Sequence, residues 1–271
     1  MLRERGLSPK KHFGQNFLAD PRVSQAIALL CLPTPGGTVV ELGAGLGALT
    51  APLLARDAHV IAVERDRDLV PLLCERFEAE LGAGALVVLE ADAKAVDPAA
   101  LVAGRPEPHV LAGNLPYQLT GPLLELAIQS CGAFARIVFL VQLEVAVRLA
   151  ARPGADAYGA LSVFAQAQSS VRRAMVVRKG AFDPVPKVDS AVIVLEPLPI
   201  PIAQETPEFR AVVSGAFSQR RKQLRNAWRG LLGRAPNEVE AAANRAGIDL
   251  SARGETLSPQ DFARMTRELC A

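Results

Sequence analysis

Residues 39–47 read Val-Val-Glu-Leu-Gly-Ala-Gly-Leu-Gly, an apolar β-branched run that passes directly into closely spaced glycines. The apolar run predicts a buried strand, and the glycines predict a tight turn that leads into a helix. Bare backbone in such a turn lets a nucleotide lie close to the chain and to the helix N-terminus. The stretch therefore predicts a nucleotide-binding α/β domain whose ligand lies at the end of this strand.

Short apolar runs of the same kind recur along the first two thirds of the chain. They cover residues 38–42, 59–63, 85–89, 109–112, 136–141, 171–177 and 191–195. Helix-period stretches separate most of them, which predicts βαβ units around a parallel sheet. Only residues 179–190 separate the last two runs, and this Pro-containing segment is too irregular for a helical crossover. We therefore expect an α/β fold with a Rossmann-like, seven-stranded sheet that is mostly parallel and has an antiparallel last strand.

The composition changes after residue 196. Prolines at positions 197, 199 and 201 prevent a regular helix and are typical of a linker. Beyond them, residues 207–217, 219–232, 236–246 and 258–269 each have a helical pattern, and the last begins with a capping sequence, Ser258 followed by Pro259 and Asp261. The sequence thus predicts a nucleotide-binding domain over residues 1–198 and a small all-α domain over residues 199–271.

Composition excludes several classes of protein. Half of the residues are apolar, 21% are charged and the formal net charge is +2, which is typical of a globular chain. The four cysteines lie far apart without a CxxC pair and there are only three histidines, so we expect neither a disulfide framework nor a metal site. The first fifteen residues are basic and polar, and no stretch approaches 18 uninterrupted apolar residues. We therefore expect a cytoplasmic protein that neither is exported nor spans a membrane.

The glycine turn has an acidic partner. Glu64 ends the second predicted strand, where its carboxylate could accept hydrogen bonds from ribose hydroxyls. This combination favours S-adenosylmethionine, but Gly43, Gly45 and Ala48 also satisfy the dinucleotide pattern GxGxxA, and a purely structural turn is a third reading. Asp92, after the third predicted strand, could accept a hydrogen bond from an adenine amine, or it could simply form an Asx turn.

The fourth predicted strand ends in a more specific motif, because residues 113–117 read Gly-Asn-Leu-Pro-Tyr. The exocyclic amine of adenine is a poor nucleophile because its lone pair is delocalised into the ring. If the side-chain oxygen of Asn114 and a backbone carbonyl of the turn accept hydrogen bonds from the two N–H groups of this amine, its lone pair becomes available for attack. Pro116 fixes the turn, and Tyr117 offers a face on which an extruded base can stack. The alternative is a structural β-to-α turn with a buried tyrosine.

These motifs together resemble a known family. Residues 114–117 and 41–47, the segment Lys-His-Phe-Gly-Gln-Asn-Phe-Leu at 11–18 and the segment Phe-Asp-Pro-Val-Pro-Lys-Val-Asp-Ser-Ala at 182–191 are similar to those of the rRNA adenine dimethyltransferases. Residues 217–226 (Phe-Ser-Gln-Arg-Arg-Lys-Gln-Leu-Arg-Asn) favour the small-subunit branch over the large-subunit resistance enzymes. The resemblance covers nearly the whole chain. It implies transfer of methyl groups from S-adenosylmethionine to the N6 amines of two adjacent adenosines near the 3′ end of 16S rRNA.

The resemblance also implies roles for individual residues. It puts Asn16 and Leu18 at the donor site with Gly43, Gly45, Glu64, Asp92 and Asn114, and it puts Leu115, Pro116 and Tyr117 at the reacting base. It makes Phe182 a second aromatic face opposite Tyr117, whereas the sequence by itself favours a core position or a loop anchor for Phe182. One departure is Leu143, where the family usually has a basic residue, so a phosphate contact is absent there or is supplied by Arg148 or Arg152.

A basic segment follows in the C-terminal domain. From Arg210 to Arg234 there are seven arginines and lysines and no acidic residue. Within the predicted helix over 219–232, Arg221, Arg225 and Arg229 recur every fourth residue, with Lys222 beside them, so they would form one face. Such a stripe suits an RNA backbone, although a solvated helix face is the plainer reading. Two lysines near the N-terminus, Lys10 and Lys11, are weaker candidates for RNA contact.

Two rival functions remain open at this stage. An NAD-dependent oxidoreductase would use the same glycine turn, but no hydride-handling group of residues is evident. A non-catalytic ribosome-assembly factor would use the same basic surface. The expected partner is 16S rRNA within the small ribosomal subunit or its precursor, and we expect no membrane and no obligate protein partner.

Overall fold

The computed structural model describes residues 15–219 and 221–271, which form two compact units. The first contains the described residues up to Ala146 together with Arg172–Glu196, and the second contains Val147–Val171 and Pro197–Ala271. The C-terminal part of the second unit therefore begins next to the expected boundary at residue 198. Residues 147–171, which the sequence assigned to the first domain, pack with the second unit. The domain assignment itself stays a prediction.

The first unit is an α/β layer structure. Its elements, including α7 and β7 that cross the unit boundary, are β1 (Phe17–Leu18), α1 (Pro21–Cys31), β2 (Thr38–Leu42), α2 (Thr50–Leu54), β3 (His59–Glu64), α3 (Val70–Arg76), α4 (Glu78–Gly82), β4 (Leu86–Glu90), α5 (Pro98–Val102), β5 (His109–Asn114), η3 (Tyr117–Leu119), α6 (Thr120–Gln129), η4 (Cys131–Ala133), β6 (Arg136–Gln142), α7 (Leu143–Leu149), β7 (Ser169–Val177), η5 (Lys179–Ala181), β8 (Phe182–Asp183) and β9 (Ser190–Pro197).

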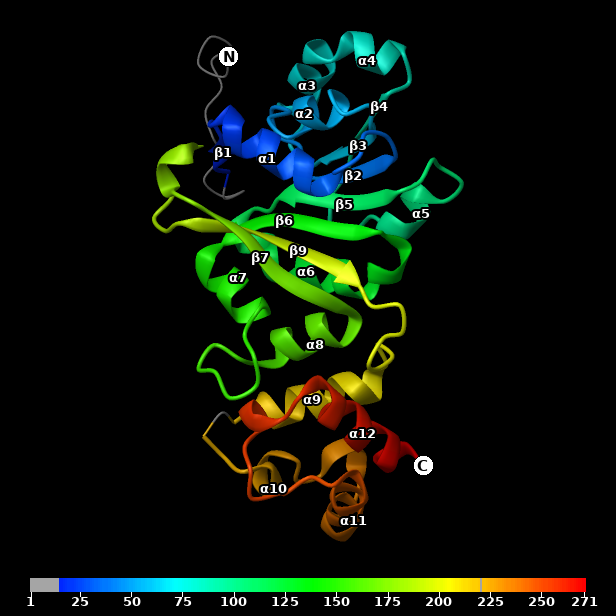
Figure 1. Cartoon of the computed structure of the whole chain (residues 1–271), viewed down its shortest axis with the longest axis vertical. Helices are drawn as coiled ribbons and strands as arrows, with labels where there is room; N and C mark the ends of the chain where they lie inside the picture. Colours follow the sequence, from blue (N-terminus) through cyan, green and yellow to red (C-terminus); the bar gives the residue numbers. More distant parts are fainter. Residues whose placement is uncertain (1–14, 220) are drawn as a thin grey trace. The chain divides into compact units, whose positions relative to one another are not determined.

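The main sheet has seven strands in the order β4-β3-β2-β5-β6-β9-β7 (Figure 1). Strand β2 pairs in parallel with both β3 and β5, β3 pairs in parallel with β4, and β5 with β6. Strand β9 runs antiparallel to β6, with Gln142 opposite Ser190. The predicted seven-stranded, mostly parallel sheet with an antiparallel last strand is therefore confirmed.

Both faces of the central strands are buried, which explains their nearly continuous apolar sequences. Alternate residues such as Val39, Val110 and Val138 join the core cluster to which α1, α2 and α3 also contribute. The intervening residues, such as Val40 and Leu111, are buried as well. Because the interior positions of the central strands are buried, a shift of register would disrupt their packing, so the register is fixed and with it the position of the residues at the strand ends.

The site lies where the parallel strands end. Strand β2 lies between β3 and β5. From β2 the chain adds β3 and β4 on one side, and it then crosses back to add β5 and β6 on the other side, so the strand order reverses at β2. In open α/β sheets this reversal leaves a crevice at the carboxyl ends of the strands. A separate two-stranded ribbon pairs β1 with β8, with Leu18 opposite Phe182.

The second unit is helical. It contains α8 (Ala160–Gln168), α9 (Pro207–Phe217), α10 (Leu224–Ala227), η6 (Leu231–Gly233), α11 (Pro236–Ala246), η7 (Gly254–Thr256) and α12 (Pro259–Cys270). An aromatic cluster holds it together, since the ring of Phe217 lies 6.0 Å from that of Tyr158 and 5.9 Å from that of Phe262. The buried Trp228 contacts Phe262 edge-on and donates its indole N–H to the Val212 carbonyl at 2.8 Å.

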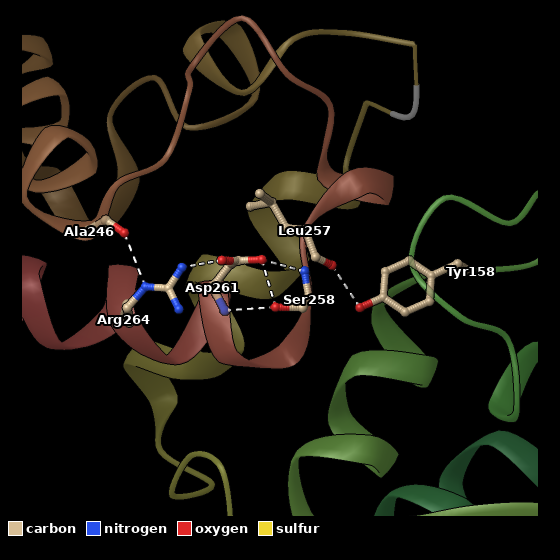
Figure 2. A network of polar contacts seen from close by, with 6 residues as sticks. All are labelled: Tyr158, Ala246, Leu257, Ser258, Asp261 and Arg264. Atoms are coloured by element: carbon tan, nitrogen blue, oxygen red, sulfur yellow. Dashed lines mark hydrogen bonds and ion pairs between the residues drawn. The ribbon is translucent and has the colours of Figure 1, made fainter.

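A polar network fixes the start of α12 in this unit (Figure 2). The Ser258 hydroxyl accepts the Asp261 backbone N–H at 3.2 Å, and the Asp261 carboxylate accepts the Ser258 backbone N–H at 2.7 Å. This reciprocal capping box was predicted from the sequence and is confirmed. Arg264 binds the same carboxylate, and the Tyr158 hydroxyl donates to the Leu257 carbonyl at 2.9 Å. Tyr158 thereby ties residues 147–171 to the C-terminal helices.

The predicted helix over residues 219–232 was wrong. Among the described residues of this range the only α-helix is α10 (Leu224–Ala227), followed by the short 3-10 turn η6. It starts at Leu224 because the backbone N–H groups of Leu224 and Arg225 donate to the carbonyls of Ala252 and Leu250 rather than to the preceding turn. Gly230 then adopts a left-handed conformation with φ 72°, which ends the regular backbone. Arg221, Arg225 and Arg229 consequently do not share a helix face. No helix in the described part of the chain is long and apolar enough to cross a membrane.

Candidate active site

A cavity of about 300 Å³ lies in the first unit at the carboxyl ends of β2, β3, β4 and β5. Residues 15–18, 43–46, 63–66, 91–93 and 114–117 contribute to its lining. The structure thus brings together most of the site residues that the sequence singled out: Asn16, Leu18, Gly43, Gly45, Glu64, Asp92, Asn114, Leu115, Pro116 and Tyr117. Such a volume is in the range of small-molecule sites.

The glycines after β2 adopt a backbone that other residues avoid. Gly43, Gly45 and Gly47 have φ values of 76°, 57° and 77°. At Gly45 an added Cβ would lie 3.3 Å from Phe17 Cε1, and at Gly47 it would lie 2.3 Å from Phe77 Cε2. The turn therefore needs glycine for its conformation throughout, and at Gly47 also for the close packing of α3.

Glu64 closes β3 and braces this turn. Its Oε2 accepts the Gly45 N–H and its Oε1 accepts the Asp66 N–H, both at 2.8 Å. Burial raises the pKa of Glu64, while the two backbone N–H bonds act in the opposite direction. Each carboxylate oxygen keeps a further lone pair, so Glu64 can brace the turn and also accept a hydroxyl.

Asp92 follows β4 and lines the cavity beside it. Its Oδ1 accepts the Lys94 N–H at 3.0 Å, which is the Asx turn that the sequence allowed. Its Oδ2 lies 3.2 Å from a guanidinium nitrogen of Arg65. The structural and ligand-binding readings of Asp92 are therefore compatible, because the turn uses only part of the carboxylate.

Asn114 is the last residue of β5, and its amide has a fixed orientation. The Nδ2 group donates to the Asn16 carbonyl at 3.0 Å. This leaves Oδ1 as the acceptor at a cavity-lining position. The neighbouring Leu115 also lines the cavity. The Pro116 carbonyl accepts the Leu119 N–H and the Thr120 hydroxyl, whereas among residues 15–219 and 221–271 no turn or loop N–H donates to the Leu115 carbonyl.

Tyr117 begins the short η3 turn and is half-buried along the cavity. Its hydroxyl is hydrogen-bonded to Ser190 Oγ at 2.8 Å. Burial raises the pKa of Tyr117 above its usual range, so the hydroxyl stays protonated at neutral pH.

Phe182 lies elsewhere, which corrects the expectation that it faces Tyr117 across the cavity. It is 2% exposed, belongs to the core cluster and does not line the cavity. Its backbone pairs with Leu18 in the β1–β8 ribbon, and this pairing draws the ring into the core. The reading from sequence alone, a core position or loop anchor, describes this arrangement.

The segment before α1 forms one wall of the cavity. Gln15 Nε2 donates to Asp66 Oδ2 at 2.8 Å, the Asn16 carbonyl accepts from Asn114, and Leu18 is 8% exposed. Asn16 and Leu18 therefore line the same cavity as the glycine turn and Asn114, and their contact with a donor stays a prediction.

The basic candidates have different outcomes. Lys10 and Lys11 lie outside the described residues, as does Arg220. Arg221, Lys222, Arg225 and Arg229 are all exposed on the second unit. Asp249 approaches Arg225 from another segment: its pKa is lowered mainly by Ser251 and to a lesser extent by the Arg225 guanidinium. Residues 210–234 contain no acidic residue, but in the folded structure an acidic residue from another segment lies near them.

The charges around the cavity discriminate between the two cofactors that the glycine turn allows. Three carboxylates, Glu64, Asp66 and Asp92, line it against two guanidinium groups, Arg65 and Arg76, while burial raises the pKa of the fourth acidic residue, Glu41, and keeps it protonated near neutral pH. The Gly45 N–H, which a dinucleotide site would direct at a pyrophosphate, instead donates to Glu64. An acidic cavity suits a sulfonium cation and disfavours a pyrophosphate dianion. No group of three or more His, Cys, Asp or Glu side chains in the described chain is placed to hold a metal ion.

Comparison with known proteins decides the family. A sequence profile described as ribosomal RNA adenine dimethylase matches residues 6–270. The chain belongs to this dimethylase family. This confirms the family expected from the motifs and, with it, an S-adenosylmethionine-dependent methyltransferase.

Relatives of the dimethylase are similar over their full length. The chain is 44% identical over 278 residues to "Ribosomal RNA small subunit methyltransferase A" of Anaeromyxobacter sp. (strain K), covering 99% of this chain and 96% of the relative. It is 40% identical to the protein of the same name from Geobacter sulfurreducens, covering 100% and 98%.

Solved structures share the dimethylase fold. A dimethyladenosine transferase from Plasmodium falciparum aligns with a TM-score of 0.74 at 23% identity, covering 92% of this chain and 95% of that one. The 23S rRNA methyltransferase ErmE aligns with a TM-score of 0.67 at 27% identity, covering 94% and 100%.

Several residues of the dimethylase site were missed by sequence reasoning. Gln15 and Asp66 link two walls of the cavity, and Ser190 holds Tyr117. Gln15 and Ser190 both lie inside motifs that carried the family resemblance, which is the signal that could have identified them.

Glu41 is a further carboxylate of the cavity floor. It is 1% exposed, and its Oε2 accepts the Thr50 hydroxyl at 2.6 Å. Burial raises the pKa of Glu41 to about 8, with a smaller contribution from the charge of Glu64.

This pKa predicts a pH-dependent stability. An unfolded glutamate titrates near pH ~4.3, so between that value and pH 8 the folded chain keeps a proton that the unfolded chain has lost. Stability should therefore fall as pH rises through this window. In Glu41→Gln this loss of stability is absent. The difference in free energy of unfolding between the variant and wild type should therefore shift by at least about 1 kcal/mol in favour of the variant from mildly acidic to alkaline pH.

Urea unfolding across this pH range measures the effect. The exposed Glu240→Gln is the matched control and should follow the wild-type curve. Parallel curves for wild type and Glu41→Gln would show that Glu41 is ionised in the folded protein throughout.

Proposed function

We propose that this dimethylase transfers methyl groups from S-adenosylmethionine to the N6 amines of two adjacent adenosines near the 3′ end of 16S rRNA, in the small ribosomal subunit or its precursor. The observation that carries the proposal is the orientation of Asn114. Its amide N–H is held by the Asn16 carbonyl, which presents Oδ1 at the cavity as a hydrogen-bond acceptor. The relatives named small subunit methyltransferase A support the choice of ribosomal subunit.

The donor would be held at the carboxyl ends of β2, β3 and β4. Gly43 and Gly45 leave room for it, Glu64 would accept ribose hydroxyls, Asp92 would accept an adenine N–H, and Asn16 and Leu18 would complete the wall. When bound, S-adenosylmethionine supplies a methyl group that is already activated by a positively charged sulfur. The acidic lining fits that charge.

The target amine needs polarisation and alignment. Oδ1 of Asn114 would accept one N–H of the adenine amine, and the Leu115 carbonyl would accept the other. These two bonds localise the nitrogen lone pair and direct it away from the acceptors. Orientation of this kind contributes a large part of the acceleration when the electrophile is already reactive.

The proton of the amine does not require a strong base in the site. Tyr117 is unsuited to that role, since burial raises its pKa and keeps its hydroxyl protonated. We assign to Tyr117 the stacking of an extruded adenine on its ring face, with Pro116 fixing the backbone before it at φ −57°. The amine proton can leave to solvent after methyl transfer.

The RNA backbone would be bound by the exposed cations of the second unit. Arg225 lies in α10, and Arg221, Lys222 and Arg229 lie in the turns and bends on either side of it. Because the four do not share one helix, they would follow an irregular phosphate path. A role for Lys10 and Lys11 remains part of the same proposal. Because the proposed substrate is ribosomal RNA, the proposed compartment is the cytoplasm.

Removing charge from this surface should change how salt affects RNA binding. Each lost phosphate contact lowers the slope of log K against log salt by about 0.7 for single-stranded RNA. The double variant Arg221→Ala/Arg225→Ala should therefore reduce the slope by about 1.4. Filter binding at several salt concentrations measures it.

Arg245→Ala is the matched control, because Arg245 is engaged by Glu268 at 2.7 Å and should leave the slope unchanged. A wild-type slope in the double variant would remove these two arginines from the RNA interface.

Mass mapping of the product tests the proposed function. Undermethylated small subunits are incubated with the enzyme and labelled S-adenosylmethionine, and the RNA is digested for mass analysis. Dimethylated adenosines at two adjacent positions near the 3′ end are expected. Binding of subunits without any transfer would instead identify the chain as an assembly factor.

A further inference from the structure

A fully buried hydroxyl lies behind the proposed base-stacking ring. Ser190 is 0% exposed and its Oγ is hydrogen-bonded to the Tyr117 hydroxyl at 2.8 Å. The two residues are 73 positions apart in the chain, and one belongs to the turn after β5 and the other to the start of β9. A stacking role alone requires only an aromatic face, so the buried hydroxyl pair needs its own explanation.

Ser190 stands on a rigid framework. It pairs with Gln142 at the end of β6, and the carbonyl of the preceding Asp189 accepts the Leu143 N–H at 3.0 Å. The Asp189 carboxylate in turn accepts the Lys179 N–H at 2.9 Å and binds Arg178 at 2.8 Å. Backbone pairing on one side and the carboxylate bonds on the other thus fix the position of the Ser190 hydroxyl.

The Tyr117 ring is consequently held at both ends. Its Cβ end follows Pro116, whose backbone is constrained, and its hydroxyl end is bound by Ser190. A tyrosine side chain turns about two torsions, and a hydrogen bond at its far end restricts both. The ring face along the cavity is then set before any base arrives, which lowers the entropic cost of stacking.

We propose that Ser190 is a positioning residue that fixes the Tyr117 ring for the target adenine through this hydrogen bond. The inference rests on the proposed function, because it takes the target base to be stacked on Tyr117. It assigns to the start of β9 a task in alignment of the base rather than in binding of the donor.

A double-mutant cycle tests the inference. Wild type, Tyr117→Phe, Ser190→Ala and the double variant are compared for kcat and for KM of undermethylated small subunits. Each single variant should lose roughly tenfold in kcat with KM changed less than about twofold, the size expected for one hydrogen bond needed in the aligned complex. The double variant should be no worse than either single variant, because both remove the same interaction.

Ser169→Ala is the matched control. Ser169 is also a buried serine at the start of a sheet strand, but its hydroxyl donates to the Ala165 carbonyl at 2.8 Å. It should keep wild-type kcat. Donor affinity by calorimetry should be unchanged in Ser190→Ala, since a merely structural defect would weaken donor binding as well.

The outcomes separate the two proposals. Wild-type kcat in Ser190→Ala, or losses that multiply in the double variant, would overturn the positioning role alone. No transfer by the wild-type chain would overturn the proposed function and this inference with it.

Discussion

Replacing Asn114 by alanine should lower methyl transfer by about a hundredfold to a thousandfold, with RNA binding retained. The alanine removes the Oδ1 acceptor that would polarise the adenine amine and leaves the Asn16 carbonyl without its N–H donor. The exposed cations of the second unit that are assigned to RNA are unchanged by this substitution. The reacting nitrogen would therefore keep its access to the site but lose one of its two acceptors.

Single-turnover transfer of labelled methyl to small subunits, with filter binding of the same samples, measures both quantities. Asn244→Ala, at an exposed position of α11, is the control and should behave as wild type in both. Transfer near the wild-type rate by Asn114→Ala would reject the role of this amide, whatever the outcome at other positions.

Replacing Gly47 by alanine should destabilise the first unit by about 3 kcal/mol and abolish donor binding. Two costs combine at this position. The φ of 77° strains any residue with a Cβ, and that Cβ would lie 2.3 Å from Phe77 Cε2 and 2.9 Å from Leu73 Cδ1. Relief requires the buried side chains of Phe77 and Leu73 or the turn itself to move, and a shift of the turn displaces the backbone that lines the cavity.

Gly84→Ala separates the two costs. Gly84 has a nearly equal φ of 73°, but an added Cβ would have nothing within 4 Å. It should lose only about 1 kcal/mol in urea unfolding and keep its affinity for the donor. Equal losses in the two variants would show that backbone strain, and not the packing of α3, dictates glycine at position 47.

The sheet could be predicted because its signal is local. Each apolar run, such as residues 59–63, became a strand within one or two residues of its expected limits, and the signal is strongest in the central strands, which are apolar because they are buried on both faces. Glu64 and Asn114 could be placed at the site for the same reason. Each ends a parallel strand, and such strand ends meet at one edge of the sheet.

Features that depend on distant contacts could not be predicted. The helix expected over 219–232 rested on a repeat of charged residues, and nothing in that repeat shows that the carbonyls of Leu250 and Ala252 take the N–H groups of residues 224 and 225. The resemblance placed Phe182 opposite Tyr117, whereas its pairing with Leu18, which joins segments at opposite ends of the domain, holds it in the core as the sequence by itself favoured. Side-chain partners such as Ser190 for Tyr117 are likewise set only by the folded register.

The bond between Asn114 and the Asn16 carbonyl has a wider consequence. In the proposed mechanism, competence for chemistry depends on docking of the short segment that carries Asn16, which contributes nothing to the main sheet. A chain could thus form the complete main sheet, show native helix and strand content, and still be inactive until that segment has docked. Maturation of the enzyme and attainment of its fold are, in this architecture, separable events.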